Sequence, residues 1–144
     1  MAKDQKLENV LYYLIEKTNK VVRRYSQLRF AEAGIDITVD QWLVLKKIGD
    51  SDRITQIELA NALFKDRASI TRILDLLLSK RLVHKEEGDD KRAYELSLTG
   101  KGKKFTEGAL SIVKDVRRKG IHTMSEKQQE QLRDSLQKII SNLE

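Results

Sequence analysis

The spacing of apolar residues predicts a mostly helical chain. Apolar residues repeat every 3.5 to 3.6 positions in several stretches, which places them on one face of a helix. From 82 to 98 the pattern changes to the alternation of strands, around the turn cluster 88–91. Over 54–102 the order is helix, short turn, helix, strand, charged turn, strand, as in a winged helix-turn-helix. The predicted helices cover about 4–33, 39–49, 56–63, 67–80, 100–119 and 126–143.

The predicted helix at 67–80 has one apolar and one polar side. Its apolar side follows the i, i+3, i+4, i+7, i+8 spacing of a buried stripe. The opposite side is small, hydroxylic and cationic near the N-terminus, which suits a helix that lies in a groove. The stripe consists of Ile70, Ile73, Leu74, Leu77 and Leu78, and the outward side of Ala68, Thr71, Arg72, Asp75 and Ser79.

Capping residues define where the helices begin. A Ser or Thr followed three residues later by Gln or Glu forms a capping box, and single Asp or Thr residues also serve as N-caps. We expect capping boxes at Thr38 with Gln41, Thr55 with Glu58, and Ser125 with Gln128, and single caps at Asp66 and Thr99. Gly34 provides a stop for the first helix.

The first predicted helix is longer than one small domain is wide. A helix over 4–33 spans about 45 Å at 1.5 Å per residue. Part of its apolar stripe is therefore expected to cover a second chain. The alternative is a helix that simply crosses its own domain.

Composition narrows the protein classes. The 144 residues suffice for one domain with a core. No apolar run approaches the roughly 20 residues of a membrane span, and the N-terminus does not resemble a signal peptide, so we expect a cytoplasmic protein with no membrane partner. The absence of cysteine excludes disulfides, thiol sensing and cysteine-bound metals.

The positive charge is concentrated in the predicted winged helix region. The net charge is +6, and residues 53–104 hold twelve Lys or Arg against eight Asp or Glu, a net of +4. An excess of positive charge is compatible with a polyanionic partner such as a nucleic acid. An ordinary solvated surface explains the same excess equally well.

The residue types at 67–72 match what DNA recognition needs. Phosphates require cations, and base edges require hydrogen-bonding side chains. The first two turns offer Arg67, Ser69, Thr71 and Arg72. Arg72 has two open interpretations, a bidentate contact to guanine or a contact to phosphate. Arg92 at the hairpin tip is placed for a minor groove, where negative potential attracts guanidinium.

The sequence argues against an enzyme. His84 and His122 are far apart and there is no cysteine, so no nucleophile–base or metal-ligand motif is present. The acidic pairs at 86–87 and 89–90 are interpreted as solvated turn charges, and no glycine-rich phosphate loop occurs. We therefore expect no catalytic residue, no metal and no cofactor.

Several motifs together resemble the MarR family of bacterial regulators. They are Thr38-Val39-Asp40-Gln41-Trp42, the run 58–63, the run 66–75, Leu82-Val83, Asp90-Lys91-Arg92, and Leu98-Thr99 with Gly102. The resemblance extends over the whole chain in length and element order. It departs at Phe64 and Arg81, where the family often has glycine, and at Leu76 and Leu78, where charged residues are common. Leu78 extends the buried stripe, whereas Leu76 lies off it.

The resemblance implies a single domain over 1–144 and an obligate homodimer. About 37–102 would form the winged helix-turn-helix, and about 4–33 and 104–144 the dimerisation helices. The dimerisation residues would be Leu7, Val10, Leu11, Leu132, Leu136, Ile139 and Ile140. The DNA-binding residues would be Arg67, Ala68, Ser69, Thr71, Arg72, Lys91 and Arg92, with Asp90 bracing the wing.

The sequence thus predicts a mainly α-helical winged helix-turn-helix that binds a pseudo-palindromic operator in double-stranded DNA as a homodimer, as a ligand-responsive repressor. Non-specific architectural DNA binding and a dimeric interaction module without DNA binding remain as alternatives. The resemblance also suggests a small aromatic or amphipathic effector near Tyr12, Tyr13, Phe30 and Trp42. Aromatic residues at such positions more often belong to the core.

Overall fold

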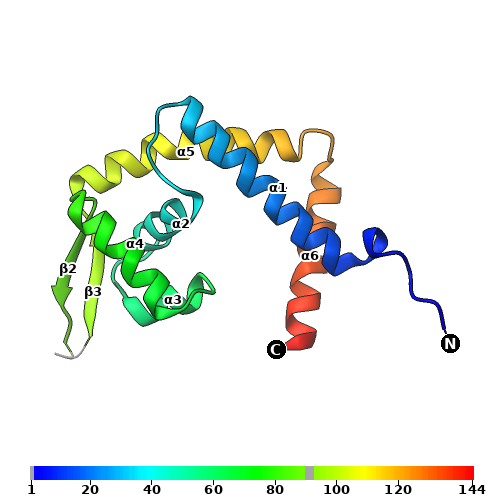
Figure 1. The fold of residues 1–144 in the computed structure, drawn as a ribbon, viewed down its shortest axis with the longest axis horizontal. Helices are drawn as coiled ribbons and strands as arrows, with labels where there is room; N and C mark the ends of the chain where they lie inside the picture. The colour runs from blue at the N-terminus through cyan, green and yellow to red at the C-terminus, as the bar shows by residue number, and fades with distance from the viewer. Residues whose placement is uncertain (1, 90–92) are drawn as a thin grey trace.

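The structure is a computed structural model that describes residues 2–89 and 93–144 (Figure 1). Asp90, Lys91 and Arg92, predicted to form the tip of the wing, lie outside the described residues. The elements are η1 (Leu7–Asn9), α1 (Leu11–Glu32), α2 (Val39–Gly49), β1 (Ile54–Thr55), α3 (Gln56–Ala62), α4 (Arg67–Ser79), β2 (Val83–Glu87), β3 (Tyr94–Leu98), α5 (Gly100–Gly120) and α6 (Glu126–Leu143).

The molecule has two parts joined by long helices. In Figure 1, α2, α3, α4 and the strands form a compact winged helix region, while α1 and α5 run side by side away from it. At the far end of α5 the chain turns and α6 descends, so that α6 and the N-terminus lie at the opposite side of the molecule from the strands. This arrangement confirms the predicted winged helix fold with extended terminal helices.

The predicted caps begin the helices as expected. Thr38 with Gln41, Thr55 with Glu58, and Ser125 with Gln128 each form a complete capping box. The side chains of Asp66 and Thr99 cap α4 and α5. These caps satisfy backbone N–H groups that have no partner within the helix, and they fix where each helix starts.

The core lies within the winged helix region and beneath α1 and α5. The predicted stripe of α4 is confirmed: Ile70, Leu74 and Leu77 are buried, and Ile73 and Leu78 pack against them. Burial of side chains of this size contributes about 1.5–3 kcal/mol each. The same cluster contains Phe30, Ile37, Trp42, Val44, Leu45, Ile48, Ile54, Leu59, Ala60, Leu82, Val83, Leu96 and Ala109.

The wing belongs to a three-stranded antiparallel sheet with the order β1-β3-β2. The hairpin was predicted, but β1 was not: Ile54 pairs with Leu96 and Thr55 with Glu95. A strand of two residues is too short to show alternation, and it directly precedes a capping box. The added strand matters because an isolated two-stranded hairpin is only marginally stable.

The predicted start of the first helix is wrong. A single helix from about residue 4 was expected, whereas Val10 has an extended backbone with ψ 126° and separates η1 from α1. Val10 also provides no side-chain cap. The 22 residues of α1 span about 33 Å rather than 45 Å. Its C-terminal end was predicted correctly, since Gly34 follows with φ 70°.

Two turns adopt left-handed conformations without glycine. Phe64, between α3 and α4, has φ 57°, and Arg81, after α4, has φ 59°. These are two positions at which the sequence departs from the family's glycines. Such a conformation costs a non-glycine residue roughly 1 kcal/mol. The chain thus keeps the turn geometry while using less favourable residues.

Candidate nucleic-acid interface

A chain of hydrogen bonds fixes the polar side chains at the start of α4. Asp66 Oδ1 accepts the backbone N–H of Ser69 at 2.7 Å, and the Ser69 hydroxyl donates to Asp66 Oδ2 at 2.9 Å. Arg72 Nη2 in turn donates to Ser69 Oγ at 3.2 Å. The bond from the Ser69 backbone lowers the pKa of Asp66, with a smaller contribution from the charge of Arg72. Ser69 therefore acts mainly as the donor to the cap Asp66 and as a support for Arg72.

Thr71, one turn along from Arg67, is linked to another helix. Its hydroxyl donates to the Arg67 carbonyl at 2.9 Å and accepts Gln56 Nε2 at 2.6 Å. Gln56 is the first residue of α3 and was not predicted as a site residue. Fifteen residues separate Gln56 from Thr71, so local sequence patterns gave no signal for this contact.

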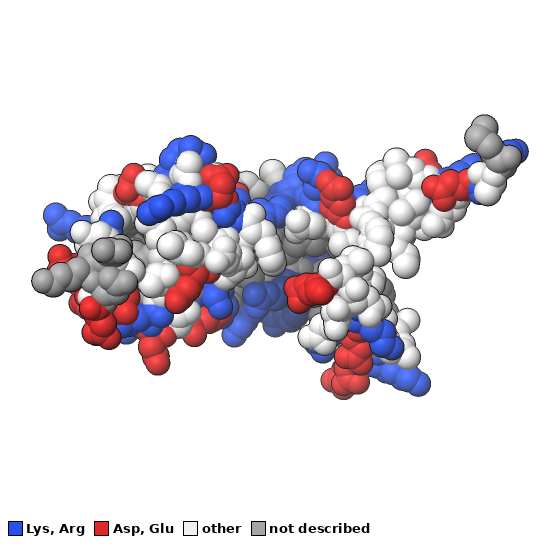
Figure 2. All heavy atoms as spheres, turned by 90° about the horizontal axis from the view of Figure 1, so that it is seen from below, with Lys and Arg blue, Asp and Glu red and all other residues white. Residues whose placement is uncertain are grey.

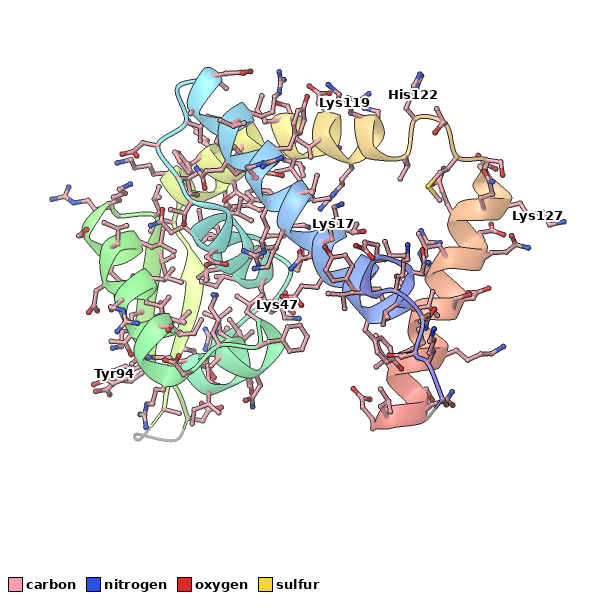
Figure 3. The ribbon with its side chains drawn as sticks, turned by 45° about the vertical axis from the view of Figure 1, so that its right-hand side comes forward. Lys17, Lys47, Tyr94, Lys119, His122 and Lys127 are labelled. Atoms are coloured by element: carbon pink, nitrogen blue, oxygen red, sulfur yellow. The ribbon has the colours of Figure 1, made fainter. Side chains whose placement is uncertain are left out.

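A small hollow lies between the beginnings of α3, α4 and β3. Its volume is about 90 Å³, and Gln56, Arg67 and Tyr94 contribute to its lining together with Thr55, Ile57 and Ala93. Tyr94, labelled in Figure 3, pairs with Glu87 at the turn end of the hairpin, and Lys85 Nζ lies 4.3 Å from the centre of its ring. The hollow thus lies between the predicted reading helix and the turn end of the hairpin.

The charges of this region are mixed rather than uniformly basic. Figure 2, which views the molecule from below, shows Lys and Arg interspersed with Asp and Glu over the winged helix region. Arg53, for example, contacts Glu95 at 3.2 Å and Glu86 at 3.8 Å. The positions of individual cations, among them the exposed Arg67 and Arg72, therefore matter more than the net charge.

Asp40 joins three parts of the molecule. From the first turn of α2, its Oδ1 accepts Arg23 Nη1 of α1 at 2.8 Å, and its Oδ2 contacts Lys65 Nζ of the α3–α4 turn at 3.1 Å. Burial raises the pKa of Asp40, but the hydrogen bonds from Arg23 and Lys65 outweigh it, so the pKa lies below its usual 3.8. Lys65 directly precedes Asp66, the N-cap of α4, so this cluster connects α1 with the start of α4.

The four aromatic residues predicted for an effector site do not share one cavity. Phe30 and Trp42 are buried and line a cavity of about 190 Å³ between α1, α2 and α5, with Arg23 and Arg117 at its polar side. Tyr13 lines a separate hollow on α1, and Tyr12 is exposed. Phe30 and Trp42 thus belong to the hydrophobic core and also line the wall of this cavity.

Leu76 lies at the edge of a second hollow. It is 37% exposed and lines an open groove of about 570 Å³ between α4 and the α1–α2 connection. Lys80 crosses this groove to the Asp36 carbonyl at 3.2 Å. The position of Leu76 off the buried stripe is therefore explained by the groove that it borders.

The residues predicted for dimerisation are largely exposed in the single chain. Leu7, Leu11, Leu132 and Ile140 are 50% to 65% exposed, and no residue of α6 is buried. Val10, Leu136 and Ile139 are partly exposed. A helix with an apolar face and no buried residue presents a surface that a partner could cover.

The described residues show neither a metal cluster nor a membrane-spanning helix. His84 lies on β2, and His122, labelled in Figure 3, lies in the turn after α5. Within 2–89 and 93–144, no three His, Asp or Glu residues are arranged to hold a metal ion. Over the same ranges, each helix is too short or too polar to cross a membrane.

Comparison with known proteins agrees with the geometry. The MarR family profile matches residues 35–93. A transcriptional regulator of Staphylococcus saprophyticus, SarZ, is 30% identical over 116 residues, which cover 79% of this chain and 77% of SarZ. The multiple antibiotic resistance protein MarR of Salmonella typhimurium is 31% identical over 97 residues, or 67% of this chain and 63% of MarR.

A solved structure shows the same fold with DNA. A mutant MarR from E. coli, complexed with operator DNA, superposes with a TM-score of 0.82 at 28% identity, over 95% of this chain and 99% of that one. The fold and the polar end of α4 define a winged helix DNA-binding protein. The chain belongs to the MarR family of transcriptional regulators. These relatives are regulators rather than enzymes.

Proposed function

We propose that this regulator binds a pseudo-palindromic operator as a homodimer and represses transcription in the cytoplasm until a ligand releases it. The observation that supports sequence-specific binding is the hydrogen-bonded end of α4, where Asp66, Ser69 and Arg72 hold one another. Side chains fixed before binding lose less conformational entropy when they meet DNA. Arg67, Ala68, Ser69, Thr71 and Arg72 would face the major groove.

The wing would add a second contact. Lys91 and Arg92 follow β2 and precede β3 in the sequence, and we propose that they meet the adjacent minor groove, with Asp90 bracing them. A guanidinium group is favoured there by the negative potential of a narrow groove. This part of the proposal rests on the sequence and on the family resemblance, because the three residues lie outside the described ranges.

The exposed apolar face of α6 supports the homodimer. Two-fold symmetry would present two α4 helices to half-sites roughly 34 Å apart. The experiment is selection of bound duplexes from a random pool by the purified full-length protein. Two inverted half-sites about one turn apart are expected. A specificity ratio near one would favour architectural binding, and no binding at low salt would favour an interaction module.

The cavity bordered by Phe30 and Trp42 supports ligand responsiveness. Its apolar wall fits an aromatic or amphipathic molecule, and Arg23 and Arg117 add positive charge. Arg23 also holds Asp40, which contacts Lys65 beside the cap of α4. A ligand that engages Arg23 would compete with Asp40 and loosen this connection. Repeating the selection with candidate aromatic acids tests it: release of the bound DNA is expected, and unchanged binding would contradict it.

A further inference from the structure

The side chain of Gln56 lies against the outward face of α4. Its Nε2 donates to Thr71 Oγ1 at 2.6 Å, and it lines the same hollow as Arg67. Gln56 belongs to α3, outside the helix that the sequence singles out for base reading. Its contact with an exposed residue of α4 brings it to the surface that would face the bases.

The hydroxyl of Thr71 is committed within the protein. A hydroxyl has one hydrogen to donate and two lone pairs that accept. The hydrogen is used by the Arg67 carbonyl, and one lone pair accepts Gln56 Nε2. Thr71 can donate to a base only by giving up the bond to Arg67. Without any rearrangement it offers DNA its remaining lone pair, which can only accept, and its γ-methyl group, which suits contact with a thymine methyl.

The same bonds fix the orientation of the Gln56 amide. Because the Thr71 hydrogen is already donated to Arg67, the atom facing Thr71 must be a donor, so it is Nε2 and not Oε1. One N–H of Gln56 is thus used. The second N–H and Oε1 are the donor and acceptor that match N7 and N6 of adenine.

We propose that Gln56 determines specificity by reading an adenine, and that Thr71 positions its amide while contacting a thymine methyl. This assignment deepens the proposed sequence-specific binding and rests on it. Gln56 on α3 and Thr71 on α4 act as one reading unit. Although a hydrogen bond joins the two residues, the Gln56 amide would contact an adenine and the Thr71 methyl group a thymine.

Two substitutions of Thr71 separate these roles. Thr71→Val keeps a methyl group but removes the acceptor that holds Gln56, so adenine discrimination should fall while thymine preference remains. Thr71→Ser keeps the acceptor and removes the methyl, so thymine preference should fall, roughly fourfold for one buried methyl, while adenine discrimination remains. The opposite pattern would show that the Thr71 hydroxyl itself reads a base.

Gln56→Ala should remove adenine discrimination, by roughly tenfold to a hundredfold for a bidentate contact, and leave the other positions of the motif unchanged. Asn61→Ala, exposed on the same helix, is the control and should select the wild-type motif. The readout is selection from a random duplex pool with each purified full-length variant. Affinity for random DNA is measured alongside, and the control Asn61→Ala should leave it unchanged.

The outcomes distinguish this inference from the proposed function. If the wild-type protein selects no motif, sequence-specific binding fails and the inference fails with it. If the wild type selects a motif and Gln56→Ala selects the same one, only the inference is overturned. The inference would be established if Gln56→Ala loses one adenine position of the motif, Thr71→Val loses adenine discrimination only, and Thr71→Ser loses thymine preference only.

Discussion

At the scale of single residues, the polar face of α4 carries fewer free groups than its sequence suggests. Ser69 is occupied by Asp66 and Arg72, and Thr71 by Arg67 and Gln56. Sequence reasoning treats each hydroxyl as an independent reader. The structure indicates that these groups serve first to hold neighbouring side chains in place.

Gly102 is required because there is no space for a side chain at this position, and not because of an unusual φ angle. A Cβ atom built on it would lie 1.9 Å from the Leu82 carbonyl oxygen, which accepts the Thr99 N–H at 3.1 Å. A contact below 3.0 Å with backbone forces the chain to move. The start of α5 and the end of the α4–β2 connection are therefore packed backbone to backbone at this residue.

We expect Gly102→Ala to lower the free energy of unfolding by about 3 kcal/mol, as severe overpacking does. The matched control is Gly108→Ala in the same helix, where a Cβ meets nothing within 4 Å. That change should stabilise the protein by about 0.5–1 kcal/mol, since alanine favours helix interiors. Urea denaturation followed by circular dichroism measures both. Equal effects of the two substitutions would contradict the close contact at Gly102.

At the scale of elements, the ion cluster around Asp40 joins α1, α2 and the turn before α4. None of the three side chains is fully buried: their exposed fractions are 36% for Asp40, 38% for Arg23 and 23% for Lys65. Partly exposed ion pairs contribute at most about 1 kcal/mol each. The cluster therefore contributes little to the free energy of unfolding, and its main effect is to connect α1, α2 and the turn before α4.

We expect Asp40→Asn to lower the free energy of unfolding by about 1 kcal/mol at neutral pH. Folding lowers the pKa of Asp40 below 3.8, so the charged carboxylate stabilises the native state above that pH, and this contribution is lost as the pH falls through the native pKa. The difference between the wild type and the variant should therefore shrink in acid. Denaturant titrations at neutral pH and well below 3.8 measure it.

Asp50→Asn is the control for Asp40. Asp50 contacts Lys46 at 2.6 Å at the end of the same helix and joins no second element. Its substitution should cost only a few tenths of a kcal/mol, as for a helical i, i+4 pair. A variant of Asp40 that matched Asp50→Asn in stability at every pH would argue against the three-way connection.

At the scale of the whole molecule, the proposed operator binding requires a second chain. In the single chain, α6 has no buried residue and carries a row of apolar side chains. Figure 1 shows it standing away from the winged helix region. One copy presents one α4, whereas an inverted repeat in DNA needs two at a fixed distance. Dimerisation through the terminal helices would supply that distance.

We expect Leu136→Glu combined with Ile140→Glu to convert the protein to monomers, because two buried carboxylates in an apolar interface are costly. Light scattering after size exclusion should give about twice 16.7 kDa for the wild type and a single chain mass for the variant. Gln137→Glu, exposed on the same helix, adds a comparable charge and should stay dimeric. A wild-type monomer, or a dimeric double variant, would refute the α6 interface.

The sequence by itself determined the features that depend on near neighbours along the chain. The capping boxes at Thr38, Thr55 and Ser125 act over three residues, and the buried stripe of α4 repeats within one or two turns. Short-range contacts of this kind leave a readable spacing. The winged helix order followed from them, and the family was indicated separately by the resemblance of its motifs. The break at Val10, which no capping residue signals, was not predicted.

Only the tertiary structure decided the contacts between distant segments. Gln56 meets Thr71 across 15 residues, Arg23 meets Asp40 across 17, and β1 joins β3 across about 40 residues of chain. Such contacts depend on the angle at which helices and strands pack, and no periodicity in the sequence encodes that angle. The sequence therefore predicted that α4 reads DNA, and the packing of α3 against it is what places the Gln56 amide beside Thr71 of α4.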